Sequence, residues 1–370
     1  MLRSILPIVG ADPALAQALS QTGNRDIAMP RGLVPPALAL LAGAGAAAEG
    51  PAAGPGAPGG AEAEAGEGDS AAHSGPAAGR AGSPDANGAL AAHSGPGGEQ
   101  ARPLAVAVTA TGRGAEELAA ALGSYLPGEA VDVFPAWETL PHERLSPRSD
   151  TVARRLRVQR RLAHPAEFPP LRILAMPVRA LLQPIAAGLG DLAPVRVRLG
   201  DAVDLEALER DLAGAAYSRV DMVERRGEFA VRGGILDVFP PTDPRPSRIE
   251  LFGDEVEEIR TFSVADQRSL EPVGEVYAPP CREILVDERV RARARGLVKD
   301  LPGAVDMLDR IAAGSAPEGM ESLAPALVDM VPVLDTLPAD ARIALVEPER
   351  VAQRADSLIA TTEEFLAAAW

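Results

Sequence analysis

The stretch Glu228-Phe-Ala-Val-Arg-Gly-Gly-Ile-Leu-Asp-Val-Phe-Pro240 predicts a β-hairpin. Two adjacent glycines between alternating segments are a strong signal for a tight turn. A helix is expected shortly before the hairpin, at 205–213, and a proline-rich stretch follows it. The strands expected in this region lie at 228–232, 235–239, 247–252 and 256–262. Residues 194–279 therefore predict a small α+β domain with a mostly antiparallel sheet.

Alternation along these strands separates a core face from a second face that carries charge. In the strand at 247–252 the apolar residues suit the core, which leaves Arg248 and Phe252 on the same outer face as Arg232. An exposed aromatic side chain near arginines is typical of an anchor in a protein–protein interface. The alternative is that Phe252 packs under the turn at Gly253-Asp254.

Strands alternate with helices on both sides of this domain, which predicts the parallel sheet of an α/β fold. The elements expected before residue 194 are helices at 12–19, 33–42, 114–122, 150–163 and 178–187, with strands at 104–110, 131–134 and 172–176. After residue 280 the chain is mainly helical, with a strand at 343–346 that leads into a helix starting at Pro348. The sequence thus predicts an α/β body in two parts, interrupted by the small domain.

Residues 43–103 consist mostly of Ala, Gly and Pro, with almost no large apolar side chain. Such a segment cannot bury enough apolar surface to offset the entropy cost of folding. The sequence Ala-Ala-His-Ser-Gly-Pro occurs at 71–76 and again at 91–96, which indicates expansion by duplication. We expect a disordered insertion; a metal-binding or interaction repeat is the alternative.

The basic residues narrow the possible functions. The chain has a net charge of −16, and of its 36 basic residues only Lys299 is a lysine. A phosphate-binding P-loop has the form G-x-x-x-x-G-K-[ST] and depends on its lysine. Lys299 has no glycine before it at that spacing and is followed by Asp300. A standard P-loop and a Schiff-base lysine are therefore not expected.

Other site chemistries are also disfavoured. The single cysteine, Cys281, excludes an intrachain disulfide framework and a Cys-rich zinc site. His73 and His93 lie in the Ala/Gly/Pro-rich insertion, while His142 and His164 stand beside prolines, so we expect no Ser-His-Asp or Cys-His site and no metal site. No apolar run is long enough to span a membrane, and the N-terminus does not resemble a secretory signal. We expect a cytoplasmic protein without membrane contact.

The helix expected at 150–163, with Ser149 as its N-cap, is rich in arginine. Its arginines are Arg154, Arg155, Arg157, Arg160 and Arg161. They predict either a phosphate-binding patch or a solvated helix face near a C-terminus, where cations suit the helix dipole. We favour the second interpretation. No segment of the chain shows the basic field that a domain binding duplex DNA needs.

The loop that follows the strand at 131–134 holds Trp137 and three prolines. Loops beyond the carboxyl ends of parallel strands commonly contact ligands. The alternative is a rigid crossover that Trp137 anchors, and both interpretations stay open.

Three blocks together resemble Mfd, the family of bacterial transcription-repair coupling factors. They are Trp137-Glu-Thr-Leu-Pro-His-Glu-Arg-Leu-Ser-Pro-Arg-Ser-Asp150, then Tyr217 to Pro240, then Arg248-Ile-Glu-Leu-Phe252 with Asp266-Gln-Arg268. The resemblance runs from about residue 104 to 370 and is weaker over 1–42. It implies a RecA/helicase-like, UvrB-like parallel-sheet body interrupted by a small α+β UvrA-binding domain. The implied domains are 1A at 1–42 and 104–193, domain 2 at 194–279 and domain 1B at 280–370.

In this family the small domain docks on UvrA. The positions that match its contact residues are Arg232, Arg248 and Phe252, and Arg219 is a further candidate. The related UvrB motif has a second arginine at the position of Ala230, so this chain is more similar to the coupling factors. The resemblance implies a UvrA-recruiting module in transcription-coupled nucleotide excision repair, with no catalytic residue and no cofactor of its own.

The resemblance also implies a longer protein. The full family continues into an RNA-polymerase-binding domain and a double-stranded-DNA translocase motor that uses ATP and Mg²⁺, so we expect this chain to be a fragment. RNA polymerase and double-stranded DNA are then partners of those further domains. Two alternatives remain open. One is a UvrB-like or helicase-like DNA-dependent ATPase. The other is a regulatory module that packs against the motor within the same protein and masks its own UvrA-binding surface.

Overall fold

The computed structural model describes residues 29, 31–42, 103–140 and 143–369. The helix expected at 12–19 and nearly all of the insertion at 43–103 lie outside the described residues. None of the described helices is both long enough and apolar enough to cross a lipid bilayer.

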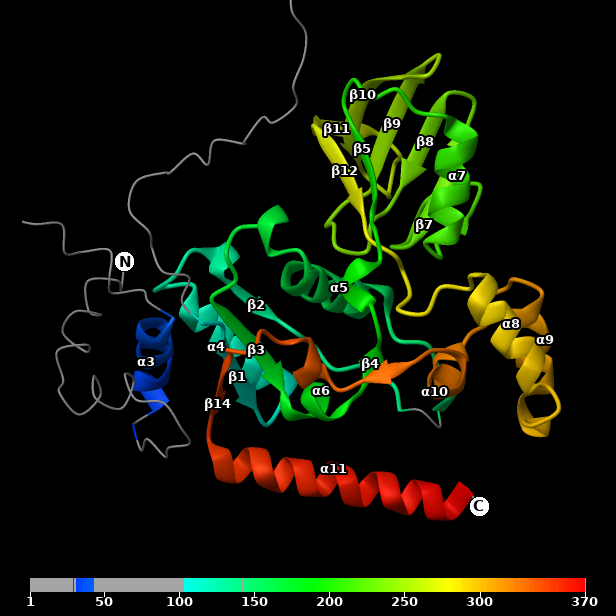
Figure 1. Cartoon of the computed structure of the whole chain (residues 1–370). Coiled ribbons are helices and arrows are strands. Elements are labelled where there is room, and N and C mark those ends of the chain that lie inside the picture. Colours follow the sequence, from blue (N-terminus) through cyan, green and yellow to red (C-terminus); the bar gives the residue numbers. More distant parts are fainter. Residues whose placement is uncertain (1–28, 30, 43–102, 141–142, 370) are drawn as a thin grey trace, which may run out of the picture. The chain divides into compact units, whose positions relative to one another are not determined.

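A four-stranded parallel sheet forms the α/β body (Figure 1). Its strands are β1 (Ala105–Thr109), β2 (Val131–Val133), β3 (Ile173–Pro177) and β14 (Arg342–Leu345). They lie in the order β14-β1-β3-β2 and all pair in parallel. Because β14 follows the small domain in sequence and still pairs with β1, the sheet draws on both parts of the chain, as predicted.

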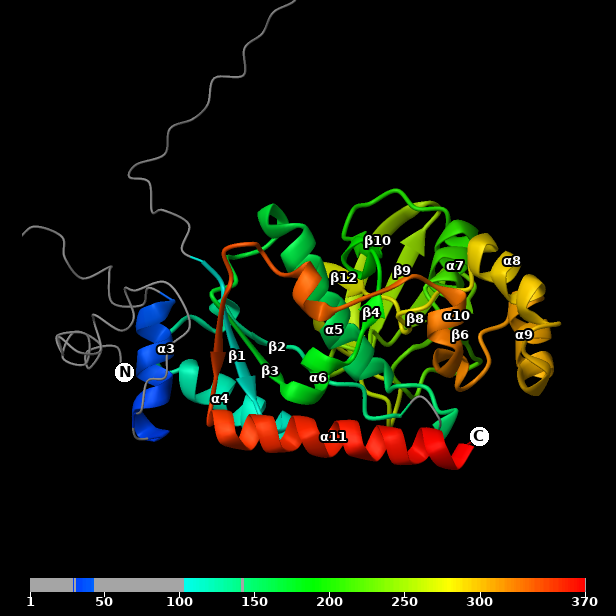
Figure 2. The same cartoon turned by 60° about the horizontal axis from the view of Figure 1, so that its bottom comes forward.

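Helices cover both faces of this sheet (Figure 2). They are α3 (Val34–Leu41) and α4 (Gly112–Leu122) on one face, and α5 (Ser149–Ala163), α6 (Val178–Leu182) and α11 (Pro348–Ala369) on the other. Alternation along β1 explains the two layers. Val106 and Val108 pack with residues of α5, α6 and α11, whereas Ala105 and Ala107 pack with residues of α3 and α4. Strand β1 is therefore buried along its whole length.

Two helix predictions need correction. The helix expected at 178–187 ends at Leu182, because Pro184 forces the residue before it out of the helical conformation. Strand β4 (Ile185–Ala186) follows and pairs with β13 (Met330–Val331). Helix α5 begins at Ser149 itself, and its N-cap is Arg148, whose side chain makes no capping bond.

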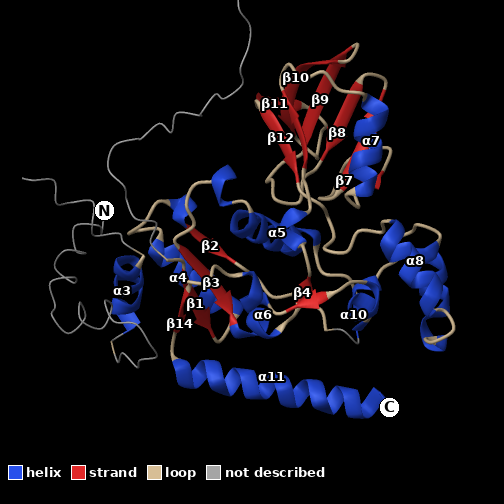
Figure 3. Cartoon of the chain, viewed as in Figure 1, coloured by secondary structure: helices blue, strands red, loops and turns tan. Residues whose placement is uncertain are grey.

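The small domain is built on a six-stranded mixed sheet (Figure 3). Its strands are β6 (Ser218–Arg219), β7 (Glu228–Arg232), β8 (Ile235–Val238), β9 (Ser247–Phe252), β10 (Glu255–Phe262) and β11 (Ser269–Pro272). They follow one another in sequence order, and every pair is antiparallel except β6 with β7. The expected hairpin and its Gly233-Gly234 turn are confirmed.

One face of this sheet packs on an apolar cluster. The cluster includes residues of helix α7 (Leu205–Gly214) and of the antiparallel pair β5 (Val195–Arg198) and β12 (Glu275–Ala278). Phe229, Leu236 and Ile249 supply the sheet's side of it. Ile249 occupies one of the alternate positions that the sequence assigns to the core face, and Phe229 and Leu236 belong to the same cluster.

The segment after the small domain forms a helical cluster with its own core. Its helices are α8 (Glu288–Leu297), α9 (Val305–Ala312) and α10 (Ala324–Leu327). Buried Val290, Leu308, Ile311 and Leu327 pack together between them.

Candidate protein-docking site

Three neighbouring strands bring charged side chains together on the outer face of the small sheet. Ala230 of β7 is the cross-strand partner of Asp237 in β8, and Asp237 is the partner of Arg248 in β9. Cross-strand partners share a face, and Arg232 lies two residues from Ala230 on the same strand. Arg232, Asp237 and Arg248 therefore form one cluster, opposite the apolar core.

Asp237 is the centre of this cluster. Its side chain is only 1% exposed and accepts three hydrogen bonds from the two guanidinium groups. Arg248 donates through Nε at 2.7 Å and Nη2 at 2.9 Å, and Arg232 donates through Nη2 at 2.8 Å. The hydrogen bond with Asp237 raises the pKa of Arg248, so this guanidinium stays charged.

Gln267 and Phe262 complete the surroundings of Arg248. Its Nη1 donates to the carbonyl oxygen of Gln267 at 3.2 Å, and the guanidinium lies 4.9 Å from the centre of the Phe262 ring. The Gln267 amide donates in turn to the carbonyl oxygens of Val223 and Val264. Asp237, Gln267 and Phe262 thus hold the Arg248 guanidinium in place, and the side chain is 16% exposed.

Phe252 ends strand β9 and is 80% exposed. The turn that follows has Gly253 in the left-handed region, with φ +64°. This conformation suits glycine and reverses the chain into β10 without covering the ring. The alternative in which Phe252 packs under this turn is therefore wrong, and the aromatic side chain faces solvent.

Arg219 does not join the cluster. In strand β6 it is the partner of Phe229, which faces the apolar core, so Arg219 extends on the opposite side of the sheet. There its Nη1 pairs with Glu209 of α7 at 2.7 Å. The structure thus brings Arg232, Arg248 and Phe252 to one face and leaves Arg219 on the other.

Sequence reasoning missed the two residues that organise this face. Asp237 had a signal, because a carboxylate inside the apolar strand Ile-Leu-Asp-Val-Phe must find a partner when buried. No local pattern indicated the role of Gln267. Its carbonyl oxygen accepts from Arg248 in a loop where Gln267 has φ +59°, and this conformation is not visible in the sequence.

Helix α5 does not present a phosphate-binding patch. All five of its arginines pair with carboxylates, which are Glu116 for Arg154, Glu283 for Arg155, Asp132 for Arg157 and Arg161, and Glu167 for Arg160. The favoured interpretation, a solvated face, is also wrong for Arg155 and Arg161, which are buried. These arginines tie the helix to neighbouring segments.

The structure favours the anchored-crossover interpretation of the Trp137 loop. The Trp137 indole Nε1 donates to Glu283 at 2.7 Å, and its backbone N–H donates to the Gln183 side chain at 3.0 Å. The Arg155 guanidinium lies 5.5 Å from the centre of the Trp137 ring. Further along the loop, the Ser146 hydroxyl donates to Glu321 at 2.7 Å. These contacts hold the loop against the segment that follows β12.

Cys281 belongs to the apolar cluster beneath the small sheet. Burial raises the pKa of its thiol from 9.0 to about 12. The neighbouring Tyr217 hydroxyl donates to the carbonyl oxygen of Pro279 at 2.9 Å, and burial raises the pKa of this phenol as well. The only thiol of the chain therefore reports whether this domain is folded.

We expect Cys281 in the folded chain to react with Ellman's reagent at pH 8 at least about 100-fold more slowly than in the urea-unfolded chain, because only the exposed thiolate reacts. Between pH 9.0 and about 12 the Cys281 thiol is deprotonated in the unfolded chain but still protonated in the folded chain. The free energy of unfolding therefore falls as the pH rises through that range. Equal reaction rates in the folded and unfolded chain would contradict the burial of Cys281.

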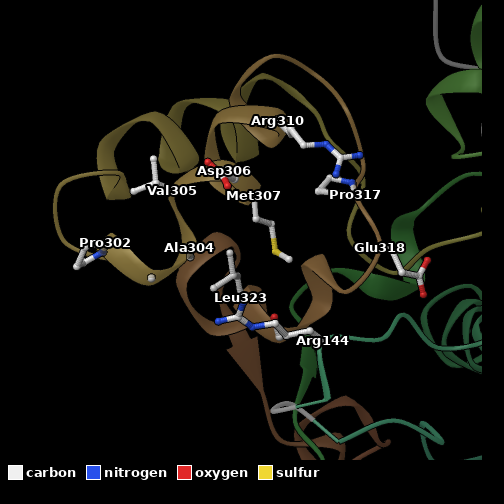
Figure 4. Close-up of a pocket in the computed structure, with 12 residues that line it drawn as sticks. Arg144, Pro302, Ala304, Val305, Asp306, Met307, Arg310, Pro317, Glu318 and Leu323 are labelled. Carbon is white, nitrogen blue, oxygen red and sulfur yellow. The ribbon is translucent and has the colours of Figure 1, made fainter.

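A separate cavity of about 330 Å³ lies at the helical cluster (Figure 4). Its lining mixes both signs of charge, from Arg144 and Arg310 to Asp306 and Glu318, with Met307 pointing into it. In the part of the chain that the structure describes, no three His, Cys, Asp or Glu side chains gather in a way that could hold a metal ion.

The chain is similar to known proteins over this domain and beyond it. Residues 195–283 match the family model of a UvrB interaction domain. Over 283 residues the chain is 48% identical to the transcription-repair-coupling factor of Mycobacterium tuberculosis, an alignment that covers 72% of this chain and 23% of that protein. It is 33% identical over 234 residues to the factor of Myxococcus xanthus, covering 60% and 19%. The factor of Escherichia coli is 32% identical over 193 residues, covering 50% and 16%. The chain thus spans about a quarter or less of the length of these relatives.

Proposed function

Since the chain is a homologue of the transcription-repair-coupling factors and contains a UvrB interaction domain, we propose that it recruits UvrA through the outer face of the small sheet. In this proposal the chain is a binding module of transcription-coupled nucleotide excision repair in the bacterial cytoplasm. RNA polymerase and double-stranded DNA are contacted by other parts of such a protein, and those parts carry its ATP and Mg²⁺ chemistry.

One observation carries the proposal. Phe252 is 80% exposed on the same face as the half-exposed Arg232, within the domain that matches the family model. Exposing a large aromatic ring to water is unfavourable unless a partner covers it, and aromatic side chains and arginines dominate the binding energy of protein interfaces. Asp237 fixes one edge of Arg232, and the rest of the guanidinium fork is available to carboxylates or carbonyl oxygens of a partner.

The loop from β1 to α4 supports a binding module over an ATPase. Thr111 caps α4 by accepting a hydrogen bond from the Gly114 N–H at 3.1 Å, and the Thr109 hydroxyl donates to the carbonyl oxygen of Thr111. The basic residue in the first turn of α4, Arg113, pairs with Glu117 at 2.7 Å. A P-loop would instead place a lysine here to reach the phosphates.

Size-exclusion chromatography of the purified chain mixed with purified UvrA tests the proposal. We expect the two proteins to elute together as a complex, and we expect the chain alone, with duplex DNA present, to release no phosphate from ATP. Separate elution at micromolar concentrations would refute UvrA recruitment. DNA-dependent ATP turnover that co-purifies with the chain would instead support the ATPase alternative.

A further inference from the structure

The two arginines of the docking face are not equivalent in the free chain. A guanidinium has five N–H donors. Arg248 uses three of them, two on Asp237 and one on the Gln267 carbonyl oxygen. Arg232 uses one, on Asp237. The exposed fractions follow the same order, 16% for the Arg248 side chain and 53% for that of Arg232.

We propose that Asp237 and Arg248 are positioning residues that hold Arg232 in place for the partner, a role that Arg248 has besides matching a contact position of the family. The inference rests on the proposed function, because the partner used to test it is UvrA. Asp237 is 1% exposed, so it acts through the guanidinium that it holds.

The physical reason is the conformational entropy of a long side chain. A free arginine on a strand samples many rotamers, and ordering such a side chain on binding costs free energy. The carboxylate of Asp237 fixes one end of the Arg232 guanidinium before the partner arrives. Arg248 keeps that carboxylate in place with a bidentate grip, which restricts its rotation and balances its charge.

The Gln267 carbonyl and the Phe262 ring fix Arg248 in turn. Phe262 is fully buried in a second apolar cluster, with Val223, Ala230 and Phe239, on the same face of the sheet as Asp237. A chain of contacts therefore links Arg232 through Asp237 and Arg248 to the buried Phe262 ring. All of these contacts are present in the free chain.

The substitution Asp237→Asn distinguishes positioning from competition. If Asp237 positions Arg232, the variant binds UvrA about 5- to 10-fold more weakly, the range expected for ordering one side chain. If Asp237 instead competes with carboxylates of UvrA for the guanidiniums, its neutralisation leaves the affinity unchanged or tightens it, and the proposal is wrong.

Three companion variants sharpen the test. Asp266→Asn removes the same charge from an exposed carboxylate beside Arg268 and is expected to change the affinity less than about 2-fold. Arg248→Lys keeps the charge but loses the bidentate hydrogen bonds to Asp237, so it is expected to bind UvrA as weakly as Arg248→Ala; full affinity for the lysine variant would contradict the proposal.

A double variant tests whether Asp237 acts through Arg232. In an Arg232→Ala background, Asp237→Asn is expected to cause no further loss of affinity for UvrA, whereas independent, additive losses would contradict the proposal.

The fold of each variant is checked by the protection of Cys281 from Ellman's reagent, since this thiol lies in the core of the same domain. If Asp237→Asn loses that protection, the comparison of Arg248→Lys with Arg248→Ala decides. A wild-type chain that fails to bind UvrA refutes the proposed function. A wild-type chain that binds, with Asp237→Asn equally tight, refutes only the positioning role.

Discussion

Replacing Phe252 by alanine is expected to weaken the binding of the chain to UvrA by about 30-fold, which corresponds to about 2 kcal/mol. The ring is 80% exposed at the end of β9, so the free chain loses almost no packing when the side chain is truncated. The loss falls on the complex, where the ring would fill an apolar pocket beside Arg232. Affinity measured by titration calorimetry should fall while the melting temperature stays unchanged.

Two control variants match this substitution. Leu182→Ala removes a large apolar side chain that is 47% exposed on α6, outside the small domain, and is expected to leave the affinity for UvrA within about 2-fold of wild type. Arg219→Ala removes an arginine on the opposite face of the small sheet, where it pairs with Glu209, and the same result is expected. If Phe252→Ala binds UvrA as tightly as these controls, the outer face is not the docking surface.

Replacing Arg155 by alanine is expected to lower the free energy of unfolding by about 3–5 kcal/mol. Arg155 and Glu283 are 0% and 1% exposed, and Nε of the arginine lies 2.5 Å from a carboxylate oxygen of Glu283. The Arg155 guanidinium also donates to the carbonyl oxygen of Pro135 and lies 4.4 Å from the centre of the Phe134 ring. Without it, the carboxylate of Glu283 stays buried, and among the described residues the Trp137 indole is the one remaining side-chain donor to it.

Urea unfolding followed by tryptophan fluorescence measures this loss, because Trp137 loses its bond to Glu283 in the same event. Arg113→Ala is the matched control, since Arg113 pairs with Glu117 on the exposed surface of α4, where solvent screening leaves an ion pair with little effect on stability. A change for Arg155→Ala no larger than for this control would mean that the buried pair does not hold the Trp137 loop to the segment after β12.

The outer face of the small sheet followed from local sequence. Alternation with a period of two assigned Arg232, Arg248 and Phe252 to one side, and the structure keeps that assignment because the opposite residues, such as Ile249, fill the core. The Gly-Gly turn fixed the register of the first hairpin in the same local way. The face on which Arg219 lies could not be predicted in this way. Its strand is short and pairs in parallel with β7, and a parallel pair has no hairpin turn that would indicate its register.

Long-range pairs were beyond sequence reasoning. Arg155 and Glu283 are 128 positions apart, and nothing in the arginine-rich helix distinguishes the buried Arg155 from the exposed face around it. The sequence likewise did not indicate that Asp132 forms ion pairs with both Arg157 and Arg161. The prediction of a helix at 178–187 was wrong for a different reason. The prediction gave the apolar pattern more weight than Pro184, which ends the helix in the structure.

In the proposed function, the face formed by β7, β8 and β9 binds UvrA. Titration calorimetry of UvrA into the wild-type chain and into the Arg232→Ala/Phe252→Ala double variant tests it most directly, with Cys281 protection confirming that both chains are folded. We predict saturable binding to the wild-type chain and at least about 30-fold weaker binding to the folded double variant. Equal affinity of the two chains for UvrA would contradict the claim.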